Sequence, residues 1–307
     1  MPERPALPAS LSVFERGWLS SNNILIRGRD ASALIDSGYC THAGQTLALV
    51  ESALAGQPLD ILVNTHLHSD HCGGNAALQG KYPDLTTFIP PGQAHHVGTW
   101  NPQALSYTPT GQRCPQFQFN ALLQPGCEVA LGDLIWQVHA APGHDPHSVI
   151  LFEPAARVLV SADALWENGF GVVFPELEGI DAFDKVAQTI DLIESLSARI
   201  VIPGHGPAFS EIEAAIASAR KRLAYFEAHP DNHIEYAAKV LLKFKLLEVQ
   251  EIELSSLIEW ARATPHFYSI HNQHFEDIEF SQWVAQLTAE LVRSGAASRQ
   301  GLLIRNA

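Results

Sequence analysis

The chain has 307 residues, 46% of them hydrophobic and 17% charged, which excludes a disordered protein and allows one sizeable domain plus a smaller one. A formal net charge of −14 argues against a general nucleic-acid binder. No stretch reaches the roughly 18 apolar residues that a membrane span needs, and no basic-then-apolar leader opens the sequence, so we expect a cytoplasmic protein without a membrane partner. The four cysteines form no Cys-x-x-Cys pair, so neither a thiolate zinc knuckle nor a disulfide framework is expected.

The first half of the chain alternates between predicted strands and helices. Apolar runs separated by turn residues predict short strands from Leu11 to Ile35. Helical spacing predicts a helix over Thr41–Gly56, and the β-branched run after it ends at His66. The segment Pro90–Pro125, rich in Pro, Gly, Gln and Thr, predicts a long loop or lid.

Regular structure returns after this segment and then changes character. β-type runs are followed by an amphipathic helix over Asp181–Ser197 and by a strand over Ala198–Gly206. Helix-rich sequence begins near Ser210, so we expect two domains, residues 1–210 and 211–307. Residues 1–206 carry 20 acidic and 9 basic residues, net −11, against 13 and 10, net −3, in the remainder. The acidity therefore lies in the front domain.

The stretch NTHLHSDHCGGN, residues 64–75, concentrates metal-ligand side chains at the end of a predicted strand. His66 and His68 leave an extended chain on one face and can converge on a single ion. Asp70 and His71 follow where the chain must turn, and the turn directs them away from the first pair, which suits a second ion. The sequence therefore predicts a metal site here.

Three more ligand-type residues each follow a predicted strand: His144 in APGHDPHS, Asp163 in LVSADAL and His205 in VIPGHG. Taken singly, each is more often structural or solvated than a metal ligand. Their coincidence with an incomplete upstream site favours the interpretation that they complete it.

These motifs together resemble those of the metallo-β-lactamase-fold hydrolases, from about Leu11 to Gly206. The resemblance implies an α/β fold, a four-layer αββα sandwich with a small helical C-terminal domain, and a site at one edge between the two sheets. It assigns one divalent ion to His66, His68 and His144, and a second to Asp70, His71 and His205, with Asp163 bridging them. Asp36 matches a position that supports the metal loops from behind.

The resemblance also implies a mechanism. Two ions, zinc before iron or manganese, would hold a bridging hydroxide that attacks the carbonyl of a small ester, thioester or lactone. Asp70, besides being a ligand, would act catalytically by orienting the hydroxide and receiving its proton. Cys72, beside the cluster, is expected to pack as a small buried side chain.

Four further residues form the expected substrate pocket. His147 lies three positions beyond His144 and is either a solvated loop residue or a substrate contact. Trp166, Phe170 and Phe174, on the loop after Asp163, form either an aromatic wall or ordinary core packing.

The sequence leaves open the role of the C-terminal tail and two alternative functions. Hydroxyacylglutathione hydrolases of this fold also end in helices, but their Asn-Pro-Phe signature is missing here, and the tail more closely resembles a small winged-helix unit that covers substrate or contacts a second copy in a homodimer. One alternative is an iron-dependent enzyme similar to the persulfide dioxygenases. The other is a regulatory metal-binding protein with weak hydrolase activity.

Overall fold

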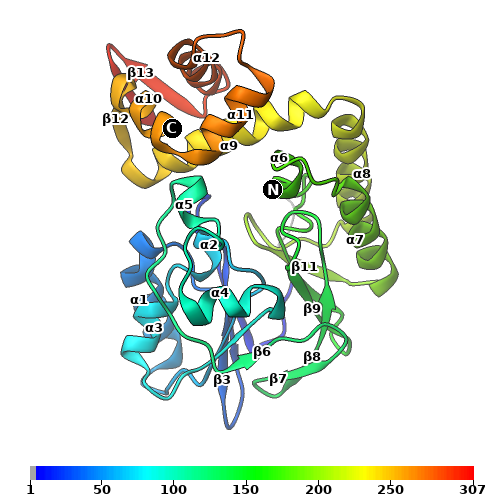
Figure 1. The fold of residues 1–307 in the computed structure, drawn as a ribbon. Helices are drawn as coiled ribbons and strands as arrows, with labels where there is room; N and C mark the ends of the chain where they lie inside the picture. Colours follow the sequence, from blue (N-terminus) through cyan, green and yellow to red (C-terminus); the bar gives the residue numbers. More distant parts are fainter. Residues whose placement is uncertain (1–4) are drawn as a thin grey trace. The chain divides into compact units, whose positions relative to one another are not determined.

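The computed structural model describes residues 5–307 and divides the chain into two compact units (Figure 1). Unit 1 consists of the residues up to Leu105 and of Arg113–Ala224, and unit 2 of Ser106–Gln112 and Tyr225–Ala307. The division falls inside helix α8 (Ile212–Ala228), whereas the boundary predicted near Ser210 precedes that helix.

Unit 1 contains two β-sheets built from short apolar strands. The first sheet has the order β1-β2-β3-β4-β5-β6, and its strands are Leu11–Phe14, Asn23–Arg27, Ser32–Ile35, Ile61–Val63, Thr86–Ile89 and Ala121–Leu122. The second sheet has the order β11-β10-β9-β8-β7, and its strands in chain order from β7 are Glu128–Leu131, Leu134–Ala140, Val149–Glu153, Val158–Ala162 and Ile200–Pro203. Strands β3 to β6 pair in parallel, as do β10 and β11, because helical crossovers connect them.

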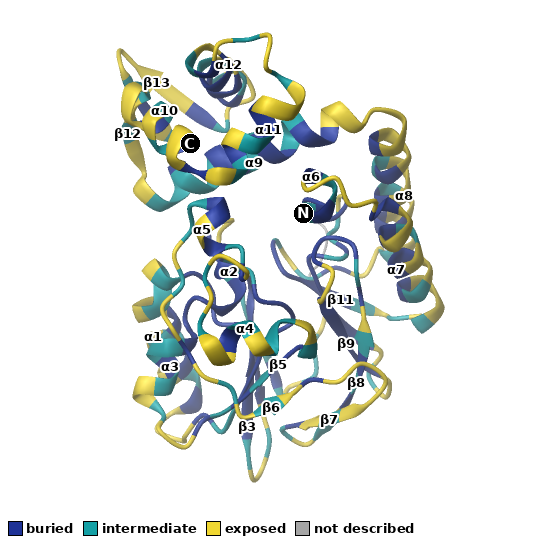
Figure 2. Ribbon diagram, viewed as in Figure 1, coloured by how far each residue is buried: buried dark blue, intermediate teal, exposed yellow. Residues whose placement is uncertain are grey.

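The alternation of side chains along the strands creates two layers of core. Ile24 and Ile26 of β2 pack between the sheets with Trp136 of β8, whereas Leu25 points to the other face. There it packs with Val50 of helix α1. Strands β3, β9 and β10 are buried along their whole length, and Figure 2 shows buried residues gathered on strands of both sheets. The expected αββα sandwich is confirmed.

Helices cover the outer faces of both sheets (Figure 1). The helices of unit 1 before α8 are α1 (Ala43–Leu54), α2 (Ser69–Cys72), α3 (Asn75–Lys81), α4 (Ala94–Thr99), α6 (Phe174–Leu177) and α7 (Phe183–Leu196), with 3₁₀ turns at Cys40–His42 and Pro91–Gln93. The segment Pro90–Pro125, predicted as one long loop or lid, instead carries short helices and strand β6.

Unit 2 combines helices with a small antiparallel sheet of order β12-β14-β13. In chain order it contains α5 (Tyr107–Thr110), α9 (Pro230–Val249), β12 (Glu251–Glu253), α10 (Leu254–Ala263), α11 (Pro265–His274), α12 (Phe280–Arg293), β13 (Ala297–Gln300) and β14 (Leu303–Asn306). The unit ends in helix α12 followed by the β13-β14 hairpin. Strand β12 was not predicted from the sequence.

The segment Ser106–Gln112 reaches unit 2 from the middle of the chain, and its helix α5 packs on α11. Tyr107 is buried, and Gly111 adopts a φ of +66° beside Trp260 and Thr264. A β-carbon at Gly111 would lie 2.8 Å from Thr264 Oγ1, so this close approach requires glycine.

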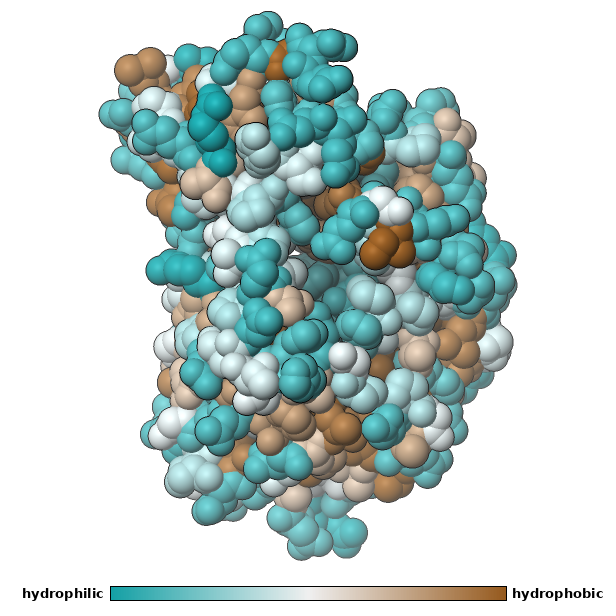
Figure 3. Space-filling model, in the orientation of Figure 1, coloured by the Kyte–Doolittle hydropathy of each residue, from teal (hydrophilic) through white to brown (hydrophobic). Residues whose placement is uncertain are grey.

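The surface view in Figure 3 shows hydrophobic residues scattered among hydrophilic ones. Among the helices of residues 5–307, none combines the length and apolar character needed to cross a membrane.

Candidate metal centre

The seven predicted ligands meet where strands of both sheets end. His66 and His68 follow β4, Asp70 and His71 lie on the short helix α2, and the other three follow β8, β10 and β11. Their side-chain atoms form two groups, each with its members within 4.8 Å of one another: His66, His68 and His144, and Asp70, His71, Asp163 and His205. Chain-distant segments therefore converge here as predicted.

The first group brings three imidazole nitrogens together. His66 Nε2 lies 3.1 Å from His68 Nδ1, which lies 2.9 Å from His144 Nε2. The far nitrogen of His144, Nδ1, is 2.5 Å from the carbonyl oxygen of Val172, so the ring is oriented with Nε2 toward the group. Asp145 Oδ2 lies 3.6 Å from His68 Nε2, and sequence analysis did not identify Asp145.

The second group combines imidazoles and carboxylates. His205 Nε2 lies 3.2 Å from Asp70 Oδ2, and His71 Nε2 lies 4.0 Å from the same oxygen. His71 Nε2 is a buried nitrogen without a hydrogen-bond partner, although it points at the carboxylates. Such a nitrogen is costly to bury unless something coordinates it.

Asp163 contacts both groups. Its Oδ2 lies 3.3 Å from His144 Nε2 and 3.4 Å from His71 Nε2. The pairing of β10 with β11 shifts register between Val160 and Ala162, and Ala162 has a φ of +46°, so the strand bends just before Asp163. A β-carbon at Gly204 would lie 2.1 Å from Asp163 Oδ1, so glycine is needed for this approach.

Asp36 supports the second group from behind, as the resemblance implied. Its Oδ2 lies 2.8 Å from His71 Nδ1 and accepts from the Thr65 hydroxyl at 2.8 Å, while Oδ1 accepts from the Thr65 backbone N–H at 2.9 Å. Asp36 itself has a φ of +57°, a conformation that Asp tolerates better than most residues. His71 is thereby oriented with Nε2 toward the carboxylates.

The electrostatics of the two groups differ. Burial, reinforced by neighbouring histidines, lowers the pKa of His66 and brings the pKa of His144 down to about 4. Burial also opposes a charged His71, but the carboxylates of Asp163 and Asp36 outweigh it and hold the pKa of His71 well above the usual value. For Asp163, burial raises the pKa, but His71 and His205 outweigh burial and keep the carboxyl ionised.

This donor set fits divalent metal ions. Neutral imidazoles and ionised carboxylates are the donors that zinc, iron and manganese share. The orphaned His71 Nε2 and the position of Asp163 between the groups indicate that the arrangement is incomplete without cations.

Two of the four predicted pocket residues lie at the site. Trp166 is half-buried, and its Nε1–H donates to Asp163 Oδ1 at 3.1 Å. The ring of Phe174 lies 4.9 Å from that of His68 and 5.7 Å from that of His144.

For the other two residues the sequence left two alternatives open. Phe170 is 1% exposed and lines a small cavity together with His144 and Asp163, and its burial agrees with core packing. His147 is exposed, and its ring packs on Gly92, where an added β-carbon would lie 2.1 Å from His147 Nδ1. The hydrogen bond from the His147 N–H to Asp145 Oδ1 helps to set the loop conformation that turns this side chain toward Gly92.

Sequence analysis missed Trp18, in the turn between β1 and β2. Its ring stacks on that of His205, with centroids 5.3 Å apart and planes 11° apart, and meets Trp166 edge-on at 5.2 Å. Trp18 is a lone tryptophan in a polar turn and belongs to no sequence motif. Its exposure, which only the structure reveals, is what identifies it.

Cys72 packs as expected. It is buried, and its Sγ lies 3.4 Å from the carbonyl oxygen of Leu67, 3.3 Å from that of His68 and 3.8 Å from Cys114 Sγ. These contacts place its sulfur among backbone carbonyls of the turn that the ligand motif forms.

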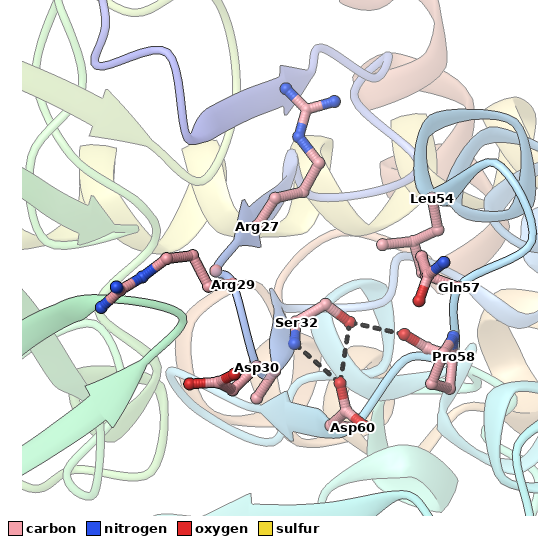
Figure 4. Close-up of a pocket in the computed structure, with 10 residues that line it drawn as sticks. Arg27, Arg29, Asp30, Ser32, Leu54, Gln57, Pro58 and Asp60 are labelled. Carbon is pink, nitrogen blue, oxygen red and sulfur yellow. Dashed lines mark hydrogen bonds between the residues drawn. The ribbon is translucent and has the colours of Figure 1, made fainter.

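A separate shallow cavity of about 190 Å³ lies at the opposite ends of β3 and β4 (Figure 4). One of its two carboxylates, Asp60, accepts from the Ser32 N–H at 2.7 Å. The Ser32 hydroxyl donates to the carbonyl oxygen of Pro58 at 2.8 Å. These bonds tie Asp60 and Ser32 to their own strand ends.

Two sheets flanked by helices, with a histidine and aspartate cluster at their edge, define a metal-dependent hydrolase class. The model of the metallo-beta-lactamase superfamily matches residues 16–205, more than half of the chain. The chain therefore belongs to the metallo-beta-lactamase superfamily, and the predicted enzyme class, a metal-dependent hydrolase of this superfamily, is confirmed.

Curated relatives include two named hydrolases. Acyl-coenzyme A thioesterase MBLAC2 of Homo sapiens is 28% identical over 63% of this chain and 76% of its own length. A hydroxyacylglutathione hydrolase of Anaeromyxobacter dehalogenans is 30% identical over 75% of this chain and 81% of its own length.

Solved structures share the fold. A metallo-beta-lactamase family protein from Thermus thermophilus matches 98% of this chain and 100% of its own with a TM-score of 0.59 at 19% identity. A protein solved in a di-iron-bound form matches 68% of this chain and 98% of its own with a TM-score of 0.55 at 25% identity.

Proposed function

We propose that this chain is a dinuclear metal-dependent hydrolase of a small ester, thioester or lactone. The observation that carries the proposal is the position of Asp163, whose Oδ2 lies 3.3 Å from one nitrogen of the three-histidine group and 3.4 Å from one nitrogen of the other. A single carboxylate shared in this way suits two ions held close together.

Thioesters are the first substrates to test. An acyl-coenzyme A and a hydroxyacylglutathione are both thioesters, and the two relatives named for these activities match 63% and 75% of this chain. Because the Asn-Pro-Phe signature is missing from the tail, we rank glutathione thioesters below the thioesters of other thiols.

When bound, two divalent ions would polarise the substrate carbonyl and lower the pKa of a bound water. A single catalytic zinc already lowers that pKa to about 7. Asp70 is ionised, because His205 and His71 outweigh the effect of burial and lower its pKa. Its carboxylate can therefore accept a proton at Oδ2 and orient the attacking water. Trp166 holds Asp163 by a hydrogen bond, and Phe174 packs against His68 and His144 of the three-histidine group.

Elemental analysis of protein purified without added metal or chelator, followed by a substrate panel, tests the proposal. We expect about two zinc ions per chain, thioester turnover that a chelator abolishes, and recovery on adding zinc. Two bound ions with negligible turnover of all esters, thioesters and lactones would overturn the enzymatic proposal and favour the regulatory alternative.

An iron-dependent redox enzyme is the second candidate. The solved relative in a di-iron-bound form favours testing iron explicitly. About one iron per chain, with oxygen consumption in the presence of a persulfide and no hydrolysis, would support this alternative instead. The predicted homodimer is tested separately, by sedimentation of the full chain.

A further inference from the structure

Trp18 is exposed although it lies beside the metal centre. It has 55% of its surface exposed, among the largest exposures of any bulky hydrophobic residue in the described chain. Isolated exposed hydrophobic residues are common and need no explanation by themselves. Trp18 differs because one face of its indole is stacked on the ring of His205.

The loop that carries Trp18 is fixed at its first end. Arg16 is buried, and its guanidinium donates to Asn23 Oδ1 at 2.6 Å, Thr46 Oγ1 at 2.8 Å and Gln45 Oε1 at 2.9 Å. The Ser20 N–H donates to the carbonyl oxygen of Gly17 at 3.1 Å and closes a tight turn around Trp18. The turn is therefore built as a rigid unit.

The other end of the loop is attached to the backbone around the second ligand group. Asn22 Nδ2 donates to the carbonyl oxygens of Pro203 at 2.9 Å and Gly206 at 2.7 Å, on either side of His205. The Ser21 N–H donates to the carbonyl oxygen of Asp70 at 2.9 Å. Because of these bonds, Trp18 keeps its position relative to His205.

Trp166 forms the second wall of the same corner. Its ring meets Trp18 at an interplanar angle of 70° and His205 at 81°. Its Nε1–H is committed to Asp163. The corner of Trp18 and Trp166 thus offers flat apolar surface directly beside two predicted ligands.

We propose that Trp18 is a specificity-determining residue whose indole stacks on a flat ring of the substrate, in its acyl or its leaving group. This inference rests on the proposed hydrolysis of a small carbonyl compound. A preorganised aromatic surface loses little conformational freedom on binding, and indole favours offset stacking on planar rings over contact with puckered ones. The surface therefore discriminates by shape as well as by apolar character.

Substrate pairs of equal carbon skeleton test the shape requirement. Phenylacetyl and cyclohexylacetyl thioesters of one thiol vary the acyl group, and acetyl thioesters of benzyl and cyclohexylmethyl thiols vary the leaving group. We expect kcat/KM to favour the flat ring by about fivefold or more in one of the two pairs. Equal values within both pairs would overturn the inference.

The variants assign the preference to Trp18. Trp18→Leu should remove the flat-ring preference, and Trp18→Phe should retain part of it. The matched control is Tyr268→Leu, which removes an aromatic ring that is 57% exposed on α11 and should leave the preference unchanged. A preference that persists in Trp18→Leu protein with unaltered metal content would assign it elsewhere and refute the inference.

A binding measurement separates this inference from the proposed function. Para-nitrophenylacetic acid should quench the tryptophan emission of the unmodified protein more strongly than that of Trp18→Leu. If metal-loaded protein hydrolyses no ester, thioester or lactone but shows this difference, the proposed function fails and the ring-binding site stands. If thioesters are hydrolysed without ring preference and without the quenching difference, the function stands and this inference fails.

Discussion

The two ligand groups of the metal centre are oriented by different means. In the three-histidine group, a backbone carbonyl, that of Val172, orients His144. In the mixed group, a side chain, Asp36, orients His71, and the Asn22 amide ties the turn that carries His205. The mixed group thus depends on the charged side chain of Asp36, and a single substitution there should unload its ion.

The groups also differ in the protons that they hold before metal binds. Burial lowers the pKa of His66 and His144, so these imidazoles are neutral and ready to act as ligands. The carboxylates of Asp163 and Asp36 overcome burial and raise the pKa of His71, so an ion entering the mixed group displaces a proton. The mixed group should therefore bind its ion more weakly as the pH falls below neutrality.

The largest expected effect comes from removing the carboxylate that the two groups share. Asp163→Asn keeps the size and the Oδ1 contact with Trp166 but removes the charge that faces His144 and His71. We expect bound metal to fall below two ions per chain and kcat/KM to fall by more than about 100-fold, beyond the usual cost of losing a supporting residue. Elemental analysis and steady-state kinetics measure both, and wild-type metal content would contradict the shared position.

A smaller effect, confined to one of the two ligand groups, is expected from Asp36→Asn. Asn also tolerates the positive φ at this position, so the substitution should preserve the backbone conformation. The loss of the carboxylate behind His71 should weaken the ion of the mixed group by about 10- to 100-fold and leave the ion of the three-histidine group in place. Competition with a metal-binding dye gives the two affinities.

Asp60→Asn provides a matched control at the opposite ends of the same strands. Asp60 also accepts a backbone N–H and lies near a hydroxyl, both from Ser32 (Figure 4). It precedes β4, whereas the ligands His66 and His68 follow that strand. Both ions should bind to this variant as to the unmodified protein. Equal weakening of both ions by Asp36→Asn would remove the distinction between the groups.

The smallest effect concerns the acid stability of metal-free protein. The pKa of His144 is about 4 in the folded chain against an ordinary value of 6.5, so between these pH values the unfolded chain binds a proton that the folded chain does not. The free energy of unfolding should therefore fall as the pH is lowered from 6.5 toward 4, by at most about 3 kcal/mol. His71 acts in a different window, because its raised pKa stabilises the fold below 6.5 and this contribution is lost as the pH rises above that value.

Urea unfolding of metal-free protein at several pH values measures this slope. His144→Asn should flatten the part between pH 6.5 and 4, because the group that titrates differently in the two states is gone. An unchanged slope would mean that other groups set the acid stability.

The ligands could be predicted from the sequence because their positions follow from short-range chain geometry. A strand end followed by a turn dictates that His66 and His68 share a direction and that Asp70 and His71 take another. Asp163 and His205 were predicted from their strand ends together with the family resemblance, and the sheet order brings strand ends of each sheet together. What sequence cannot specify is the direction of a loop side chain.

The pocket residues show this limit. His147 and Phe174 both belong to loops near His144, yet one packs on Gly92 and the other on His68. Phe170 and Trp166 lie four residues apart on one loop, yet Trp166 is half-buried and donates to Asp163, whereas Phe170 is fully buried. Trp18 was missed because its contact with His205 joins opposite ends of unit 1 through hydrogen bonds of Asn22, which no local pattern reveals.

The passage of Ser106–Gln112 through unit 2 has a consequence for biosynthesis. Helix α5 leaves the ribosome long before α11, the helix on which it packs. Tyr107 therefore stays exposed to solvent until most of the C-terminal third has been synthesised. The helical unit is thus not a detachable appendage, because part of its interior is encoded within the hydrolase sequence. Gene fusions or truncations that separate residues 211–307 from the rest would divide this interior between two polypeptides.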